Sequence, residues 1–249
     1  MQCRLCLKET VLLKKSHIWS DFLYTQMYDD KHRLVNLSLQ NYRSKFVQSG
    51  LHEADILCAK CDNEVINQYE TYAKTVFCDE VIPPVQVNYF RKEDGLEYTV
   101  INGLDYTKFK LFCLSLLWRA SISNLPFFAK VKLGKYEEAI REMLNSGNAG
   151  ELGSFPCMLS RYHNQNLPSE IVGEPREIRV PSAGVKYQNI GYVLVIGGWV
   201  FIYNITNKNT DEVFGETVIT KEGRIMIPHI PYDQGVKILN HLFNKKIFI

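Results

Sequence analysis

The stretch Leu57-Cys58-Ala59-Lys60-Cys61-Asp62 decides how the first third of the chain folds. Its two cysteines have the spacing Cys-x-x-Cys, which lets both thiolates leave one tight turn toward a single metal ion at about 2.3 Å. A second pair with the same spacing, Cys3 and Cys6, lies at the start of the chain. Two such pairs complete a tetrahedral four-thiolate site. The sequence therefore predicts one zinc ion bound by Cys3, Cys6, Cys58 and Cys61.

The predicted zinc ion is structural, because four cysteines leave no open position on the metal for catalysis. A helix is expected from Asp62 to about Val76, since no helix breaker interrupts these residues. A turn with two cysteines, a long insert and a second such turn at the start of a helix form a treble-clef arrangement. The alternative is that the cysteines are core residues, or that the two pairs bind two separate metals.

Composition limits the class of protein. The chain has 249 residues, 46% of them hydrophobic, which is enough for a sizeable core. The formal net charge of +2 means that nucleic-acid binding would need a local basic patch. The N-terminus lacks the apolar stretch of a signal peptide, and the apolar run Ile190 to Ile205 is too short to span a bilayer. We expect a cytoplasmic protein with no membrane segment. Reduced cytosolic thiols favour metal ligation over disulfides.

The rest of the chain predicts an α+β fold. Pro83-Pro84 ends the first unit, which gives a zinc-binding domain over 1–82 and an α+β domain of unknown role over 83–249. The first elements expected after the prolines are a hairpin of 85–90 and 98–101 and helices at 108–121 and 135–144. Strands at 191–196 and 199–205 and a terminal helix at about 232–243 are expected to follow. Three isolated cysteines, Cys78, Cys113 and Cys157, are expected in the core.

The insert between the cysteine pairs contains Lys14-Lys15-Ser16-His17-Ile18-Trp19, followed by Asp21-Phe22-Leu23-Tyr24. With the two cysteine pairs and the later Tyr69-Glu70, this order resembles the HNH (ββα-metal) nucleases that carry a structural zinc ion. The resemblance covers about the first 77 residues. It implies a zinc-stapled ββα unit that hydrolyses DNA with the help of Mg²⁺ or Mn²⁺.

The resemblance implies roles for particular residues. His17 falls at the position of the general base, and Asp62 at the position of a ligand to the catalytic cation. Ser16 replaces the usual first aspartate ligand, and a hydroxyl is a poor substitute for a carboxylate toward Mg²⁺. Glu70 lies eight positions further along the helix, about 12 Å away at 1.5 Å per residue, too far to share the ion directly. The central asparagine of the family is either Asn36 or Asn41.

Basic residues in the insert are expected to contact the phosphate backbone of DNA. The residues assigned to this contact are Lys14, Lys15, Arg33, Arg43 and Lys45.

Two functions remain open from the sequence. The first is a metal-dependent HNH-type endonuclease acting on DNA, for example a phage-defence or toxin effector restrained by a partner protein. The alternative is a non-catalytic, zinc-stabilised module that binds nucleic acid or protein, in which His17 is a packing residue. A zinc-dependent hydrolase or deaminase has little support, because the chain contains no His-x-Glu or His-Glu-x-x-His motif. His52 has no partner pattern and is expected at the surface.

Overall fold

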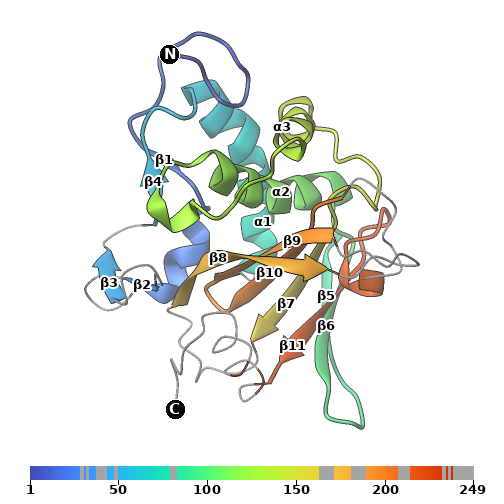
Figure 1. Ribbon diagram of the computed structural model, residues 1–249. Helices are drawn as coiled ribbons and strands as arrows, with labels where there is room; N and C mark the ends of the chain where they lie inside the picture. The colour runs from blue at the N-terminus through green and yellow to red at the C-terminus, as the bar shows by residue number, and fades with distance from the viewer. Residues whose placement is uncertain are drawn as a thin grey trace.

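The computed structural model describes residues 1–28, 31, 34–37, 44–47, 50–78, 83–162, 171–180, 189–206, 214–231, 234 and 237. For residues 26, 34–37, 44–47 and 171 it describes the backbone only. Within these ranges the chain is a mixed α+β structure in which three helices accompany a nine-stranded sheet (Figure 1).

The nine-stranded sheet has the order β3-β2-β8-β9-β10-β7-β11-β6-β5. Most neighbouring strands are antiparallel, and β2–β8 and β11–β7 are parallel. The strands are β2 (Leu34–Leu37), β3 (Ser44–Val47), β5 (Gln86–Arg91), β6 (Glu97–Asn102), β7 (Cys157–Tyr162), β8 (Ile171–Val180), β9 (Asn189–Ile196), β10 (Trp199–Asn204) and β11 (Ile225–Ile230).

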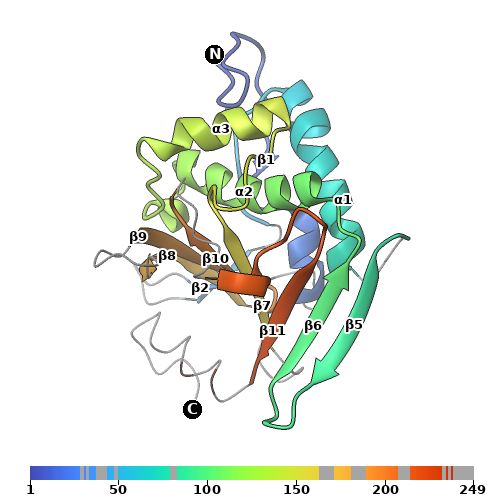
Figure 2. The same ribbon diagram turned by 90° about the vertical axis from the view of Figure 1, so that its right-hand side faces the viewer.

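Both hairpins predicted from the sequence are confirmed. The first joins β5 to β6 through a turn in which Gly95 has a φ of 85°, and Figure 2 shows it projecting from the body of the protein. The second joins β9 to β10 through Gly197 and Gly198, whose φ angles of 58° and 79° belong to the left-handed region. Glycine adopts that region without steric cost, which explains the turn between two strongly apolar strands.

A separate two-stranded sheet lies in the N-terminal region. Its strands are β1 (Ser16–His17) and β4 (His52–Glu53), which pair antiparallel with Ser16 opposite Glu53 and His17 opposite His52. A 3-10 helix (Asp21–Met27) and strands β2 and β3 of the large sheet lie between β1 and β4, and a helix follows β4. The helix begins with a wide π-helical turn at Cys61–Ile66 and continues as α1 (Asn67–Phe77).

The predicted helices in the middle of the chain are confirmed as α2 (Tyr106–Ile122) and α3 (Tyr136–Ser146). The Asp105 side chain caps α2 by accepting the Lys108 N–H, and Gly147 ends α3 with a φ of 72°. Both α1 and α3 pack on α2, and the three helices lie on one side of the sheet (Figures 1 and 2). The helix expected at 232–243 falls mostly outside the described residues.

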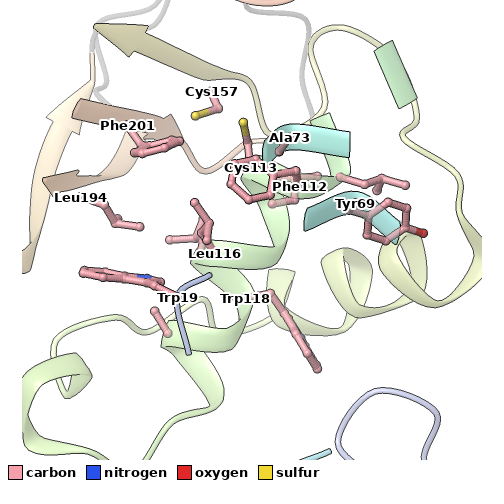
Figure 3. Close-up of a cluster of buried hydrophobic side chains, with 14 of the residues drawn as sticks. Trp19, Tyr69, Ala73, Phe112, Cys113, Leu116, Trp118, Cys157, Leu194 and Phe201 are labelled. Carbon is pink, nitrogen blue, oxygen red and sulfur yellow. The ribbon is translucent and has the colours of Figure 1, made fainter. Parts of the chain in front are cut away.

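One hydrophobic core contains residues from Cys3 to Ile227, and α2 lies at its centre. Every residue of α2 from Phe109 to Ile122 is buried, as expected for a helix that is covered on all sides. Figure 3 shows Leu116 and Cys113 on the side of α2 toward the sheet and Trp118 on the opposite side. Cys113 and Cys157 are buried as predicted, whereas Cys78 is only half-buried.

The core joins the two predicted domains. Residues on both sides of the predicted boundary at 82/83 belong to it, and β2, from the N-terminal part, pairs with β8. Among the described helices none has the length and apolar character that crossing a lipid bilayer requires.

Candidate functional site

The four cysteines predicted from the sequence form one cluster. The Sγ atoms of Cys3, Cys6, Cys58 and Cys61 all lie within 4.8 Å of one another. Four sulfurs at about 2.3 Å from a zinc ion stand about 3.8 Å apart in a regular tetrahedron, so the cluster has the right size. Three of these cysteines are buried and Cys6 is half-buried. The cluster could hold a metal ion such as zinc.

The backbone around the first pair explains how its sulfurs converge. The Leu7 N–H donates to the Cys3 carbonyl at 2.9 Å, and Leu7 has a φ of 59°, which closes the turn tightly after Cys6. The Cys58 N–H points at the Cys3 Sγ at 3.4 Å and so joins the two pairs directly. Burial raises the pKa of the Cys3 thiol, and N–H groups of Cys6 and Cys58 lower it, with a net value of about 7. At Cys3 the thiolate, which is the form that binds metal, is therefore favoured, whereas burial raises the pKa of the Cys58 and Cys61 thiols.

Helix α3 fixes the first cysteine turn from outside. The Arg141 guanidinium donates to the Leu5 carbonyl at 2.6 Å, and Glu138 orients that guanidinium through a second contact at 2.6 Å. Arg4 lies 3.6 Å from Glu137 on the same helix. The cysteine cluster is thus attached to a helix well outside the predicted zinc domain.

The hairpin of β1 and β4 has two faces with different roles. Side chains alternate along a strand, and directly opposed residues project to the same side. Ser16 is fully buried, and its partner Glu53 accepts hydrogen bonds from Ser123 and Asn124. His17 and His52 form the other pair and are partly open to solvent. The inner cluster, as we call it, consists of the buried Ser16, Ser20 and Arg119 and the half-buried Asp62 and Glu70; His17 and His52 are the outer pair.

Arg119 of α2 is the hub of the inner cluster. Its side chain is 1% exposed and lies 2.6 Å from the Glu70 carboxylate. It also donates to the His17 carbonyl at 2.9 Å and contacts the Ser20 hydroxyl at 3.3 Å. Ser20 donates to Glu70 at 2.6 Å and closes the network. A single buried arginine therefore fixes β1, the segment after β1 and α1 relative to α2.

Asp62 lies beside this network. Burial raises the pKa of its carboxyl, the Arg119 charge lowers it and the Glu70 charge raises it. The Ser16 hydroxyl also lowers this pKa, although it has no hydrogen-bond partner at normal distance in the described part of the chain. Ser16, at the position of the family's first metal-ligating aspartate, thus does face Asp62.

The π-helical turn changes the relation between Asp62 and Glu70. In a regular α-helix eight residues rotate by about 800°, which leaves two side chains about 80° apart around the axis. A π turn rotates less per residue, and the Asn67 N–H donates to the Asp62 carbonyl in this turn. Both carboxylates consequently reach the surroundings of Arg119. That Glu70 is too far away to share an ion with Asp62 stays a prediction.

The outer pair presents two imidazoles on one face. The rings of His17 and His52 have centroids 6.1 Å apart and meet edge to face at 69°. The Asp21 carboxylate lies 3.7 Å from His17 Nε2, and the exposed fractions of these two side chains are 61% and 31%. Burial lowers the pKa of His17, the Asp21 and Glu70 carboxylates raise it, and Lys15 and the neighbouring His52 lower it, so that the net change is a decrease. His17 is therefore neutral at pH 7 and can accept a proton.

The two residues predicted to be catalytic are close in the fold but not in contact. No hydrogen bond or ion pair joins His17 to Asp62, both of which are described: His17 pairs with Asp21, and Asp62 lies beside Ser16 and Arg119. The described residues contain no group of three or more His, Cys, Asp or Glu donors close enough for a metal except the four cysteines. The inner cluster offers two carboxylates of the type that Mg²⁺ binds, but Arg119 already supplies a cation there.

The predicted DNA-binding residues have mixed outcomes. Lys14 is exposed and pairs with Asp55 at 3.1 Å, and Lys15 is exposed near His17, whose pKa its charge lowers. Lys45 lies in β3 opposite Asn36, with only its backbone described. Arg33 and Arg43 fall outside the described residues.

Sequence reasoning missed two participants of the site. His52 was expected at the surface without a partner, and Asp21 was not singled out as a neighbour of His17. No local signal identifies either one, because their places follow from the register of β1 with β4 and from the turn after β1.

Comparisons of the chain with protein-family models, with curated proteins and with solved structures found no match.

Proposed function

We propose that the protein is an HNH-type endonuclease that hydrolyses DNA phosphodiester bonds, with His17 as the general base. The observation that carries the proposal is the two-stranded sheet of β1 and β4. It presents His17, partly open to solvent and neutral at pH 7, on a strand whose partner β4 precedes the cysteine turn at the start of a helix. The order of strand, strand and helix around a treble-clef zinc ion is part of the same proposal.

The chemistry needs a base beside an approaching phosphate. A neutral imidazole takes a proton from water as the water oxygen attacks phosphorus. Lys15, exposed near His17, supplies a positive charge that attracts the phosphate. Asp21 is placed to stabilise the imidazolium that forms when His17 has taken the proton.

Mg²⁺ or Mn²⁺ at Asp62 belongs to the proposal as the resemblance implies it. The residue that would hold it is Asp62, and a bound cation would supply positive charge for the scissile phosphate. Since Glu70 is already paired with Arg119, we derive no step from this ion.

The test is incubation of supercoiled plasmid with purified protein, with and without Mg²⁺ or Mn²⁺. We expect wild type to nick the plasmid and His17→Ala to lose activity by about 10²- to 10⁴-fold. His229→Ala, a histidine substitution in the nine-stranded sheet, is the matched control and should retain activity. Wild-type protein that is folded and zinc-loaded but cuts nothing would contradict the proposal.

One observation favours the alternative function of a non-catalytic binding module. The positive charge of Arg119 stands beside Asp62 and Glu70, where a nuclease of this kind holds its cation, and Ser16 replaces the first ligand. On this alternative the plasmid assay shows no cleavage, and gel-shift binding to DNA depends steeply on salt because phosphate contacts release counterions.

A further inference from the structure

We propose that His52 is the general acid of the proposed nuclease and protonates the oxygen that leaves phosphorus. This inference rests on the proposed function, in which His17 is the base. It assigns a second catalytic residue that the sequence did not indicate.

Strand pairing places the two imidazoles on one face. His17 and His52 are directly opposed in an antiparallel pair, so both side chains project from the same side of the hairpin. Their ring centroids are 6.1 Å apart. Two imidazoles this close on one face can each turn a nitrogen toward a single phosphoryl group that lies over both rings, one toward the attacking oxygen and the other toward the leaving oxygen.

The inner cluster gives a reason for a second histidine. A metal ion in such an enzyme stabilises the leaving oxygen. Here the candidate ligand Asp62 lies beside Ser16, which offers no charge, and within the field of the Arg119 guanidinium, whose positive charge competes with a metal ion. Negative charge on the leaving oxygen then needs another source of stabilisation, and a proton donor on the outer face provides it.

A backbone carbonyl orients the His52 ring for proton donation. Its Nδ1 lies 3.1 Å from the Gly50 carbonyl, which accepts a hydrogen bond when Nδ1 carries a proton. With Nδ1 protonated, Nε2 is the nitrogen that gains and loses the transferable proton.

The reaction balances without any further reactant. His17 removes a proton from water, the water oxygen forms a bond to phosphorus, and the bond from phosphorus to the bridging oxygen breaks. The imidazolium of His52 transfers its proton to that oxygen, which leaves as a hydroxyl group. His17 then returns its proton to solvent, and His52 takes one up.

The test uses substrates in which the leaving oxygen is replaced by sulfur. A thiolate leaves without being protonated, so the substitution removes the need for a general acid and leaves the need for a base. The scissile position is first mapped with wild type, and duplexes with a bridging sulfur at that position are compared with ordinary DNA at fixed metal concentration. The variants are His52→Ala, His52→Asn, which retains a donor near Gly50, and His17→Ala.

We expect both His52 variants to lose about 10²-fold or more on ordinary DNA and less than about tenfold on the sulfur substrate. His17→Ala should lose activity equally on both substrates. An equal loss on both substrates for the His52 variants, or full activity on ordinary DNA, would overturn the assignment of His52 alone. A wild type that cuts neither plasmid nor duplex would overturn the proposed nuclease, and this inference with it.

Discussion

The cysteine cluster and the inner cluster both fasten the N-terminal segments to later parts of the chain, but they do so by different physics. The cysteine cluster uses four identical soft ligands in two short motifs. The inner cluster uses one buried guanidinium that reaches carbonyl, hydroxyl and carboxylate oxygens from three segments. The comparison teaches that a metal site can be concentrated in short motifs, whereas a buried ion-pair network is dispersed along the chain and becomes apparent only after folding.

The largest expected effect follows from removing one metal ligand. Cys58→Ser should unfold the N-terminal region, because zinc contributes about 10–16 kcal/mol of apparent binding free energy in small zinc folds. This binding free energy is as large as the whole free energy of unfolding of an ordinary domain, about 5–15 kcal/mol. Zinc content, measured with a chromogenic chelator, and hydrogen exchange of residues 1–28 would report the loss. Cys78→Ser, outside the cluster, is the control, and equal zinc content in both variants would contradict the assignment.

A smaller effect is expected from breaking the buried ion pair. Arg119→Met leaves Glu70 without its cation and should lower the free energy of unfolding by about 3 kcal/mol. This is the low end of the usual range because the Glu70 side chain keeps 21% exposure. Arg119→Met with Glu70→Leu should recover part of the loss, since a buried pair can be replaced by apolar groups. Urea unfolding would measure both, and a double variant weaker than Arg119→Met would argue against the pair as the source.

Ser20 and Ser16 allow a hydrogen-bonded buried hydroxyl to be compared with a buried hydroxyl that has no partner at hydrogen-bonding distance among the described residues. Ser20→Ala should cost about 1.5 kcal/mol, because its buried hydroxyl donates to the Glu70 carboxylate at 2.6 Å. Ser16→Ala should cost nothing measurable or should stabilise, because that buried hydroxyl has no partner at hydrogen-bonding distance among the described residues. The urea unfolding midpoints of the two variants, each compared with wild type, measure the difference between the two losses of stability. Equal losses would show that Ser16 does have a partner.

The smallest effect concerns the outer pair and pH. Burial lowers the pKa of His17 in the folded state below its ordinary 6.5. Well above pH 6.5 the ring is neutral in both the folded and the unfolded state, so its full contribution to the free energy of unfolding is present. As the pH falls below 6.5 the unfolded chain binds a proton first, so stability is lost until the pH passes the folded pKa.

We therefore expect wild type to lose stability relative to His17→Gln between pH 7 and pH 5, by less than about 1 kcal/mol. The unfolding midpoints of the two proteins at several pH values would measure this loss. A relative gain for wild type would mean that the attraction of Asp21 outweighs burial.

Several elements could be predicted because their signals are local. The turn glycines of the two hairpins, the apolar strands at 191–196 and 199–205 and the helical spacing at 108–121 each lie within a few residues. The cysteine cluster could be predicted for a related reason. The Cys-x-x-Cys spacing of each pair is local, and a tetrahedral metal site needs both pairs together. The endonuclease function and the DNA contacts remain predictions.

The sequence by itself determined the four clustered cysteines, the three helices α1, α2 and α3, the strands of the two hairpins, and the candidate base His17. Only the tertiary structure decided that His52 stands opposite His17, that Asp62 faces Ser16 rather than His17, and that Arg119 joins them to α2. The reason is that strand register and helical phase set which side chains share a face. A shift of one residue in β1, or a regular turn in place of the π turn, would place different groups together without changing any motif.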